Sequence, residues 1–169
     1  PVFERTEEAS LFRVPHTVML DNAKFKFWYG GGSSYIDGTN KTLPVYNIRY
    51  LESNSLINIP DKGIEVLDTI DEEHRVGRPN VLKDNELFKM YFGFGSDKKP
   101  YQLGYAESRD GKNWSRDDLK LGLPLSSSGW DSEMMAYPCV VKVNNKTYMF
   151  YNGNEYGKYG FGYAELVQE

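Results

Sequence analysis

Three copies of one pattern run through the chain: PHTVMLDNAKFKFWYGGG (Pro15–Gly32), RPNVLKDNELFKMYFGFG (Arg78–Gly95) and YPCVVKVNNKTYMFYNGN (Tyr137–Asn154). Each copy has a short apolar segment, a turn rich in Asp and Asn, and a second segment of alternating large residues that ends in Gly or Asn. This alternation is typical of a strand buried on one face, and such turns are typical of hairpins. Position 16 corresponds to positions 79 and 138, so the repeat has a period near 60 residues.

A third segment follows each copy and continues the alternation: YNIRYLES (Tyr46–Ser53), YQLGYAES (Tyr101–Ser108) and YGFGYAEL (Tyr159–Leu166). The second copy then adds an Asp-Gly turn and a Trp-bearing fourth segment in SRDGKNW (Ser108–Trp114). No window shows the 3.6-residue period of a helix. The sequence therefore predicts an all-β fold.

The spacing of the repeats predicts a partial β-propeller, an array of three four-stranded antiparallel blades in a single domain over residues 1–169. The blade-like repeats cover approximately residues 11–70, 71–125 and 126–169. Trp28, Tyr91 and Phe150 are expected to lie on matching faces of their blades, and the turns are predicted at Asp21-Asn22, Asp84-Asn85 and Asn144-Asn145. The alternative is three unrelated hairpins of a β-sandwich.

Composition narrows the class of function. A net charge of −4 and a pI near 5.3, with Lys and Arg scattered, argue against nucleic-acid binding. No apolar stretch is long enough for a membrane span, and the absence of a signal peptide favours a cytoplasmic location, although the first residue is Pro1 and not Met. Cys139 is expected to be a buried structural thiol within an apolar strand.

Longer phrases of the sequence resemble one superfamily. They are GRPNV (Gly77–Val81), YQLGYAESRDGKNW (Tyr101–Trp114) and GWDSEMMAYP (Gly129–Pro138). All three resemble the arabinanase, invertase and levansucrase superfamily of five-bladed propellers. The chain is most similar to glycosidase-like proteins of bacterial surface-polysaccharide gene clusters, and the resemblance covers nearly its whole length.

This resemblance implies carbohydrate recognition, and it also implies that the chain matches only the last three of five blades. In the hydrolases of the superfamily, three acids from the first three blades line the central pocket. Two of those blades have no counterpart here, so their catalytic residues cannot be carried over one by one.

The residues themselves suggest a pocket, because the innermost strand of a blade begins near the central axis. Charged and polar residues gather at these strand starts: Arg13, His16, Glu72, Glu73, His74, Arg75, Arg78, Asp131, Glu133 and Tyr137. Glu73 and Glu133 occupy comparable places in adjacent copies and could form the carboxylate pair of a glycoside hydrolase. With Asp131 they are the catalytic candidates, and Arg78 could keep one acid ionised. Alternatively, these charges form a salt-bridged ring or a ligand-binding set.

Further residues could contact a sugar. Asn152, Asn154 and Tyr156 follow the second strand of the third copy, and aromatic faces beside amide donors suit sugar rings. With Arg78, His16, Arg13 and Tyr137 they are the candidate substrate-binding residues. The two histidines follow the blade repeat and not a ligand motif, so neither a metal nor another cofactor is expected.

The sequence thus predicts a carbohydrate-recognising, glycosidase-like propeller protein that lacks a complete hydrolase active site. Two alternatives stay open: an active hydrolase that uses Glu73 and Glu133, and a non-catalytic protein-interaction module. Three blades cannot close a ring, so a homodimer of six blades is expected to complete it. The other possibility for assembly is that residues 1–11 fold back to supply the missing strand of the third copy.

Overall fold

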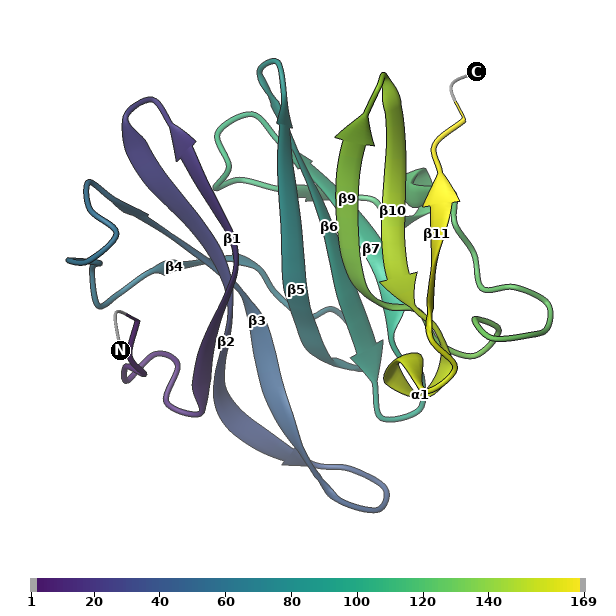
Figure 1. Ribbon diagram of the computed structural model, residues 1–169. Coiled ribbons are helices and arrows are strands. Elements are labelled where there is room, and N and C mark those ends of the chain that lie inside the picture. Colours follow the sequence, from purple (N-terminus) through teal and green to yellow (C-terminus); the bar gives the residue numbers. More distant parts are fainter. Residues whose placement is uncertain (1–2, 168–169) are drawn as a thin grey trace.

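The computed structural model describes residues 3–167 and consists almost entirely of strands (Figure 1). The first blade contains β1 (Phe12–Asp21), β2 (Lys24–Asp37), β3 (Thr42–Ser53) and β4 (Ile64–Leu67). The second contains β5 (Glu73–Asp84), β6 (Leu87–Ser96), β7 (Gln102–Ser108) and β8 (Ser115–Arg116). The third contains β9 (Ala136–Val143), β10 (Lys146–Asn152) and β11 (Phe161–Glu165).

The fold is therefore an all-β, propeller-like array that is not closed. Within the described residues the third blade has three strands, so the expected four strands per blade hold only for the first two. Two four-residue helices complete the structure: the 3-10 helix η1 (Asp118–Leu121) and α1 (Asn154–Gly157). In the part of the chain that is described, no helix has the length and apolarity needed to cross a bilayer.

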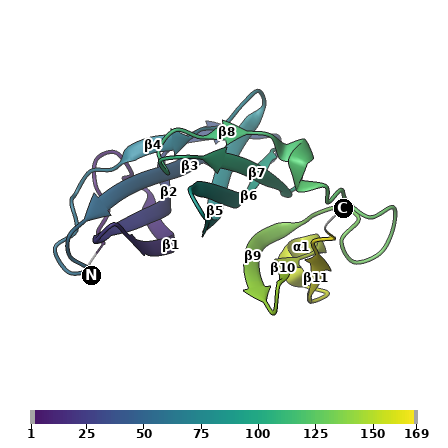
Figure 2. The ribbon, with the colours of Figure 1, turned by 90° about the horizontal axis from the view of Figure 1, so that it is seen from above.

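The blades are arranged along an arc. A single parallel pairing, Tyr46 with Arg75, links the first two blades into one sheet, while β9–β11 form a separate sheet. Seen from above, β9–β11 turn under the arc made by the other two blades, so the inner strands β1, β5 and β9 face a common concavity (Figure 2).

The pairing register confirms the alignment of the three copies. Equivalent residues lie side by side in the first three strands of each blade, in the sets Thr17–Trp28–Tyr50, Asn80–Tyr91–Tyr105 and Cys139–Phe150–Tyr163. Directly opposite residues share one face of a sheet. Trp28, Tyr91 and Phe150 therefore lie on matching faces, as predicted.

Asparagine makes the hairpin turns possible. The two central turn residues are Asn22-Ala23, Asn85-Glu86 and Asn144-Asn145, so the first two turns lie one residue later than predicted. The first central residue of each turn has positive φ, which asparagine tolerates well, and the φ angles of Asn22, Asn85 and Asn144 are 50°, 54° and 49°. The second central residue also has positive φ in two of the turns, at Ala23 (59°) and Asn145 (66°).

Large side chains fill the interfaces between blades. Trp28 is fully buried against Phe88 and Trp114 of the second blade, and its indole N–H donates to the carbonyl of Gly111 at 2.9 Å. Tyr91 of the second blade packs in turn against a cluster that belongs mainly to the third blade. Each blade therefore covers the aromatic face of the blade before it.

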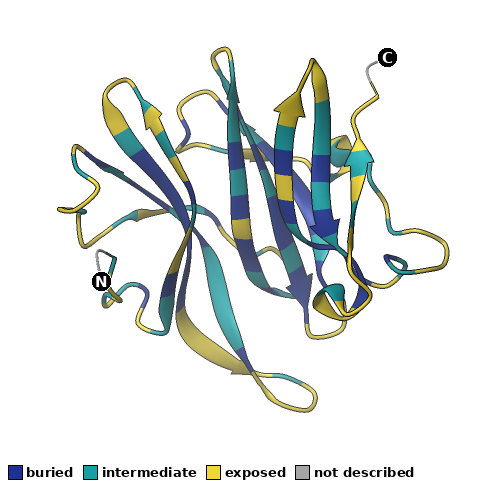
Figure 3. Cartoon of the chain, in the orientation of Figure 1, coloured by how far each residue is buried: buried dark blue, intermediate teal, exposed yellow. Residues whose placement is uncertain are grey.

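The third blade has no described neighbour on its aromatic face. Tyr163 of β11 is 60% exposed, whereas its equivalents Tyr50 and Tyr105 are 2% and 7% exposed. Figure 3 shows the distribution of buried and exposed positions over the chain. Cys139 lies on this face beside Phe150 and is exposed, so the prediction of a buried thiol is wrong. The strand is buried on one face only, through Ala136, Pro138 and Val140, and Cys139 belongs to the other face.

The N-terminal segment caps the first blade. Phe3 packs on Phe27 and Tyr29, and the Glu8 carboxylate accepts hydrogen bonds from the Tyr29 hydroxyl and the Gly63 amide, each at 3.0 Å. The described part of this segment thus lies against the first blade. The alternative in which it supplies a strand to the third copy is wrong for these residues.

Candidate functional site

A cleft of about 470 Å³ lies in the concavity of the array. All three blades contribute to its wall through the inner strands β1, β5 and β9, the adjoining ends of β3 and β7, and the turn at α1. Its polar and aromatic lining residues are Phe12, His16, Lys41, Thr42, Tyr46, His74, Arg75, Arg78, Tyr101, Tyr137 and Tyr156. Four of the predicted binding residues, His16, Arg78, Tyr137 and Tyr156, are thus brought together.

Bulges in the inner strands shape this wall. The register of pairing between the inner strand and its neighbour changes between Pro15 and Thr17 in the first blade and between Gly77 and Asn80 in the second. A similar irregularity occurs in the third blade. At the bulges Arg78 and Tyr137 have φ angles of 58° and 62°. Each precedes a proline, and the left-handed region is costly for a residue with a Cβ atom. Such local strain is concentrated at functional sites.

Tyrosines form the aromatic part of the cleft. The Tyr137 and Tyr156 rings stack with centroids 6.2 Å apart, and Tyr101 meets the Tyr156 ring edge-on at 6.0 Å. The Tyr46 and Tyr101 hydroxyls form a hydrogen bond. Tyr156 is half-exposed, so its ring is accessible to a ligand.

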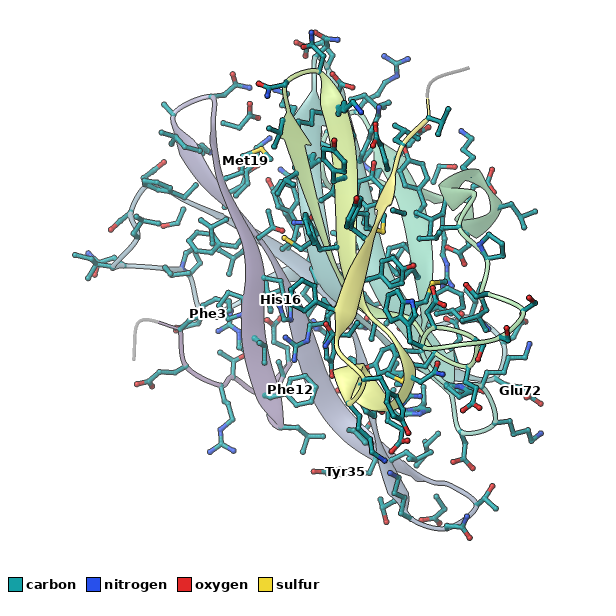
Figure 4. All side chains as sticks on the ribbon, turned by 45° about the vertical axis from the view of Figure 1, so that its right-hand side comes forward. Phe3, Phe12, His16, Met19, Tyr35 and Glu72 are labelled. Atoms are coloured by element: carbon teal, nitrogen blue, oxygen red, sulfur yellow. The ribbon has the colours of Figure 1, made fainter. Side chains whose placement is uncertain are left out.

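Cations flank the tyrosines. The Arg75 guanidinium lies 4.2 Å from the centroid of Tyr101, and that of Arg78 lies 4.3 Å from the centroid of Tyr137. Burial, aided by the charge of Arg78, lowers the pKa of His16 to about 4. His16 is therefore neutral near pH 7, and Figure 4 shows its side chain extending from β1 toward the centre of the array.

Glu73 lies on the wall of a different cleft, of about 310 Å³, formed with residues of β6, Arg116 and Asp118. Both Glu73 carboxylate oxygens accept hydrogen bonds from Arg116, at 2.8 and 3.0 Å. A register shift between Glu73 and Arg75 separates these two β5 residues, so Glu73 lines this second cleft while Arg75 lines the central one.

The acids of the third blade also lie outside the lining of the central cleft. Asp131 is buried, and its carboxylate accepts a hydrogen bond from the Tyr151 hydroxyl at 2.8 Å. Glu133 is exposed, and its backbone amide donates to the side chain of Asn154 at 2.9 Å. The structure therefore does not bring Glu73, Asp131 and Glu133 together with Arg78 on this wall.

Three predicted binding residues take part in contacts within the protein. The Asn154 side chain is buried and binds the backbone amides of Glu133 and Met134, which fixes the loop before β9. The Asn152 amide donates to the carbonyl of Tyr156 at 3.0 Å and so holds that turn. Arg13 is buried over the Phe3 ring, at 3.8 Å from its centroid, in the N-terminal cap.

Sequence reasoning missed Tyr46 and Tyr101 as cleft residues, whereas His74 and Arg75 line the cleft as expected from their place at the start of an inner strand. The signal was present, because Tyr46 and Tyr101 both open a third strand and recur one blade apart. Repeated aromatics of this kind point to packing between blades as readily as to a ligand. Within residues 3–167 no group of three His, Cys, Asp or Glu residues lies together in a way that could hold a metal ion.

No protein-family model matches the chain. The uncharacterized protein Rv1502 of Mycobacterium tuberculosis is 31% identical over 150 residues, which are 88% of this chain and 49% of the relative. The uncharacterized protein MT1551, from another strain of that species, matches to the same extent. The chain therefore spans about half the length of the curated relatives it matches.

Solved structures of glycoside hydrolases with propeller-type folds are similar to the chain. One glycoside hydrolase superposes with a TM-score of 0.70 at 17% identity, over 97% of this chain and 48% of the other. The family 117 glycoside hydrolase Zg3597 of Zobellia galactanivorans has a TM-score of 0.68 at 15% identity, over 96% of this chain and 54% of the other. The GH43 β-xylosidase/α-arabinofuranosidase CoXyl43, from a compost microbial metagenome, has a TM-score of 0.59 at 15% identity, over 93% and 47%. At these identities the likeness establishes a glycosidase-like fold.

Proposed function

We propose that the chain is a carbohydrate-recognising, glycosidase-like propeller protein that binds a saccharide in its central cleft without hydrolysing it. The observation that supports this most is the cleft itself, where Tyr137 and Tyr156 present a stacked aromatic surface beside the unpaired guanidinium of Arg78. Aromatic faces stack on the C–H faces of sugar rings, and guanidinium donors bind their oxygens.

The position of the acids favours recognition over hydrolysis by this chain. Glycoside hydrolysis needs two carboxyl groups on either side of the scissile bond. Glu73 is held by Arg116 in the second cleft, and neither Asp131 nor Glu133 lines the central one. The alternative of an active hydrolase would need these groups to be free and convergent.

A saccharide panel tests the proposal. Binding of mono- and oligosaccharides, followed by NMR chemical-shift changes, is expected to perturb residues around Tyr137 and Tyr156, and Tyr156→Ala should weaken that binding. Tyr148→Ala, in the third blade but outside the cleft, serves as the control. Release of sugar from aryl glycosides by the wild-type chain, abolished by Glu73→Gln or Glu133→Gln, would overturn the proposal in favour of the hydrolase.

We also propose that a second copy of the chain completes the ring. The repeat supports this, because the face that carries Tyr163 is covered by the next blade in the first two copies and is exposed in the third. Phe161 on the same strand is 71% exposed. A homodimer would bury these aromatics against the partner.

Light scattering coupled to gel filtration tests the assembly. The account predicts twice the 19.4 kDa of one chain at micromolar concentration, and a shift toward 19.4 kDa for Tyr163→Glu. A wild-type mass of 19.4 kDa that does not change on concentration would rule the dimer out.

A further inference from the structure

The central cleft is lined by cations without a matching acid. Lys41, Arg75 and Arg78 contribute positive charge to its wall. Among the described residues that line it, none is Asp or Glu. The chain as a whole carries a net charge of −4, so this local excess of positive charge runs against the balance of the protein.

The two arginines of this wall differ from Arg49 and Arg116, and they resemble buried Arg13 of the N-terminal cap, which also stacks on aromatic rings and has no described acidic partner. Arg49 and Arg116 each lie within ion-pair distance of two carboxylates. No described carboxylate lies within that distance of Arg75 or Arg78, and both stack on tyrosine rings instead. The Arg75 side chain donates only a long hydrogen bond, 3.4 Å to the Ser96 carbonyl, and its buried Nε has no partner.

Electrostatic coupling indicates that both arginines act on the same region. Burial raises the pKa of Tyr46 to about 12, and the charges of Arg75 and Arg78 both oppose that rise. The Tyr46 hydroxyl therefore lies within reach of both positive charges. A ligand group beside Tyr46 would experience both of them.

His74 supplies a complementary acceptor. Its ring is buried, and Nδ1 donates to the Pro44 carbonyl at 2.9 Å. In the neutral ring this leaves Nε2 as an acceptor, and no described group satisfies it. A buried acceptor on the cleft wall suits a hydroxyl donor, which a carboxylate ion alone does not offer but a sugar does.

We propose that the ligand of the central cleft is an anionic saccharide, which carries a carboxylate or phosphate group bound by Arg75 and Arg78. This inference rests on the proposed function and names the class of sugar. Guanidinium groups bind both kinds of anion through paired hydrogen bonds. Arg78 has no described acidic partner and lies beside accessible tyrosine rings, so it can bind the anionic group while a tyrosine contacts the sugar ring. The sugar ring stacks on Tyr137 or Tyr156.

A matched set of ligands tests the inference. Glucose, glucuronate and glucose 6-phosphate share one ring and differ in charge, and galactose with galacturonate repeats the comparison on a second ring. Inorganic phosphate is the anion without a sugar. Binding to the full chain is measured by NMR titration at pH 7 and low salt. At least one acidic sugar is expected to bind at least tenfold more tightly than its neutral parent, and the tighter of glucuronate and glucose 6-phosphate identifies the anionic group.

Variants connect the preference to the site. Arg78→Gln keeps the Cβ atom and the backbone constraint and should remove the tenfold preference. Arg109→Gln removes the same charge from an exposed position in the turn after β7 and should leave binding unchanged. Retention of the full preference in Arg78→Gln would overturn the inference.

The remaining outcomes separate the two proposals. Neutral sugars that bind as tightly as acidic ones would overturn the anionic ligand and leave saccharide recognition intact. Inorganic phosphate that binds as tightly as every sugar would overturn saccharide recognition, and with it this inference. No binding by any of these ligands would overturn both.

Discussion

The central cleft and the Glu73–Arg116 cleft both lie along β5, but only in the second are the arginine charges neutralised by carboxylates. In the second cleft, Arg116 binds the carboxylates of Glu73 and Asp118, so the charges are satisfied within the protein. In the central cleft, Arg75 and Arg78 have no described acidic partner. The difference divides the charged residues around β5 into a part that is paired within the protein and a part without a described acidic partner, which we propose binds a ligand.

The first prediction concerns the structural part. Arg116→Gln leaves two poorly exposed carboxylates, those of Glu73 and Asp118, without their cation. Removal of one partner from such a network is expected to lower the free energy of unfolding by about 3 kcal/mol. Urea unfolding followed by tryptophan fluorescence measures the change.

The matched variant is Arg78→Gln, which removes the same charge from the central cleft. It should change the free energy of unfolding by less than about 0.5 kcal/mol, because Arg78 is exposed and unpaired. Equal losses of stability for the two variants would show that the clefts do not differ as described.

The second prediction concerns pH. The pKa of His16 is about 4 in the folded chain, against a usual value of 6.5. Between these values the unfolded chain binds a proton that the folded chain does not, so stability falls as the pH drops from 6.5 to 4 and is unaffected by this group above pH 6.5. The loss is expected to be about 2 kcal/mol after allowance for the partial exposure of the ring.

NMR titration of the two histidine rings measures this pKa, and His16→Gln assigns the signals. Arg78→Gln should raise the pKa of His16, because it removes a neighbouring positive charge, whereas Arg116→Gln should leave it where it is. A wild-type His16 that titrates near 6.5 would contradict the burial and charge described for the central cleft.

The third and smallest effect comes from backbone strain. Arg78→Gly relieves a left-handed φ of 58° and is expected to raise the free energy of unfolding by about 1 kcal/mol while it weakens ligand binding. Thermal unfolding measures the gain. Arg109→Gly is the control, since φ at Arg109 is not positive and the added glycine should stabilise nothing.

The fold could be predicted from the sequence to the level of equivalent positions in the three copies. The three copies aligned Trp28, Tyr91 and Phe150, and these residues occupy the same register in the structure. The period-two alternation and the Asn-rich turns are local signals, so they can be recognised without knowledge of how the rest of the chain folds. What covers each blade is not local, and the exposure of Cys139 was missed for that reason.

The site was predicted less completely. The start of each inner strand suggested His16, Arg78 and Tyr137 as residues of one cleft, and the structure places them in its wall, within β1, β5 and β9. The partner of Glu73 could not be found in this way, because Arg116 lies 43 residues along the chain on an outer strand. A bulge at His74 decides which way Glu73 faces, and no pattern in the sequence marks that bulge.

The most direct test of the central claim is the pKa of His16 in the presence of ligand. An anion bound by Arg78 would offset the charge that lowers this pKa, so saturating glucuronate or glucose 6-phosphate is predicted to raise it above the value of about 4, while glucose leaves it unchanged. A His16 pKa that neither acidic sugar alters at saturation, or that glucose raises equally, would contradict the account.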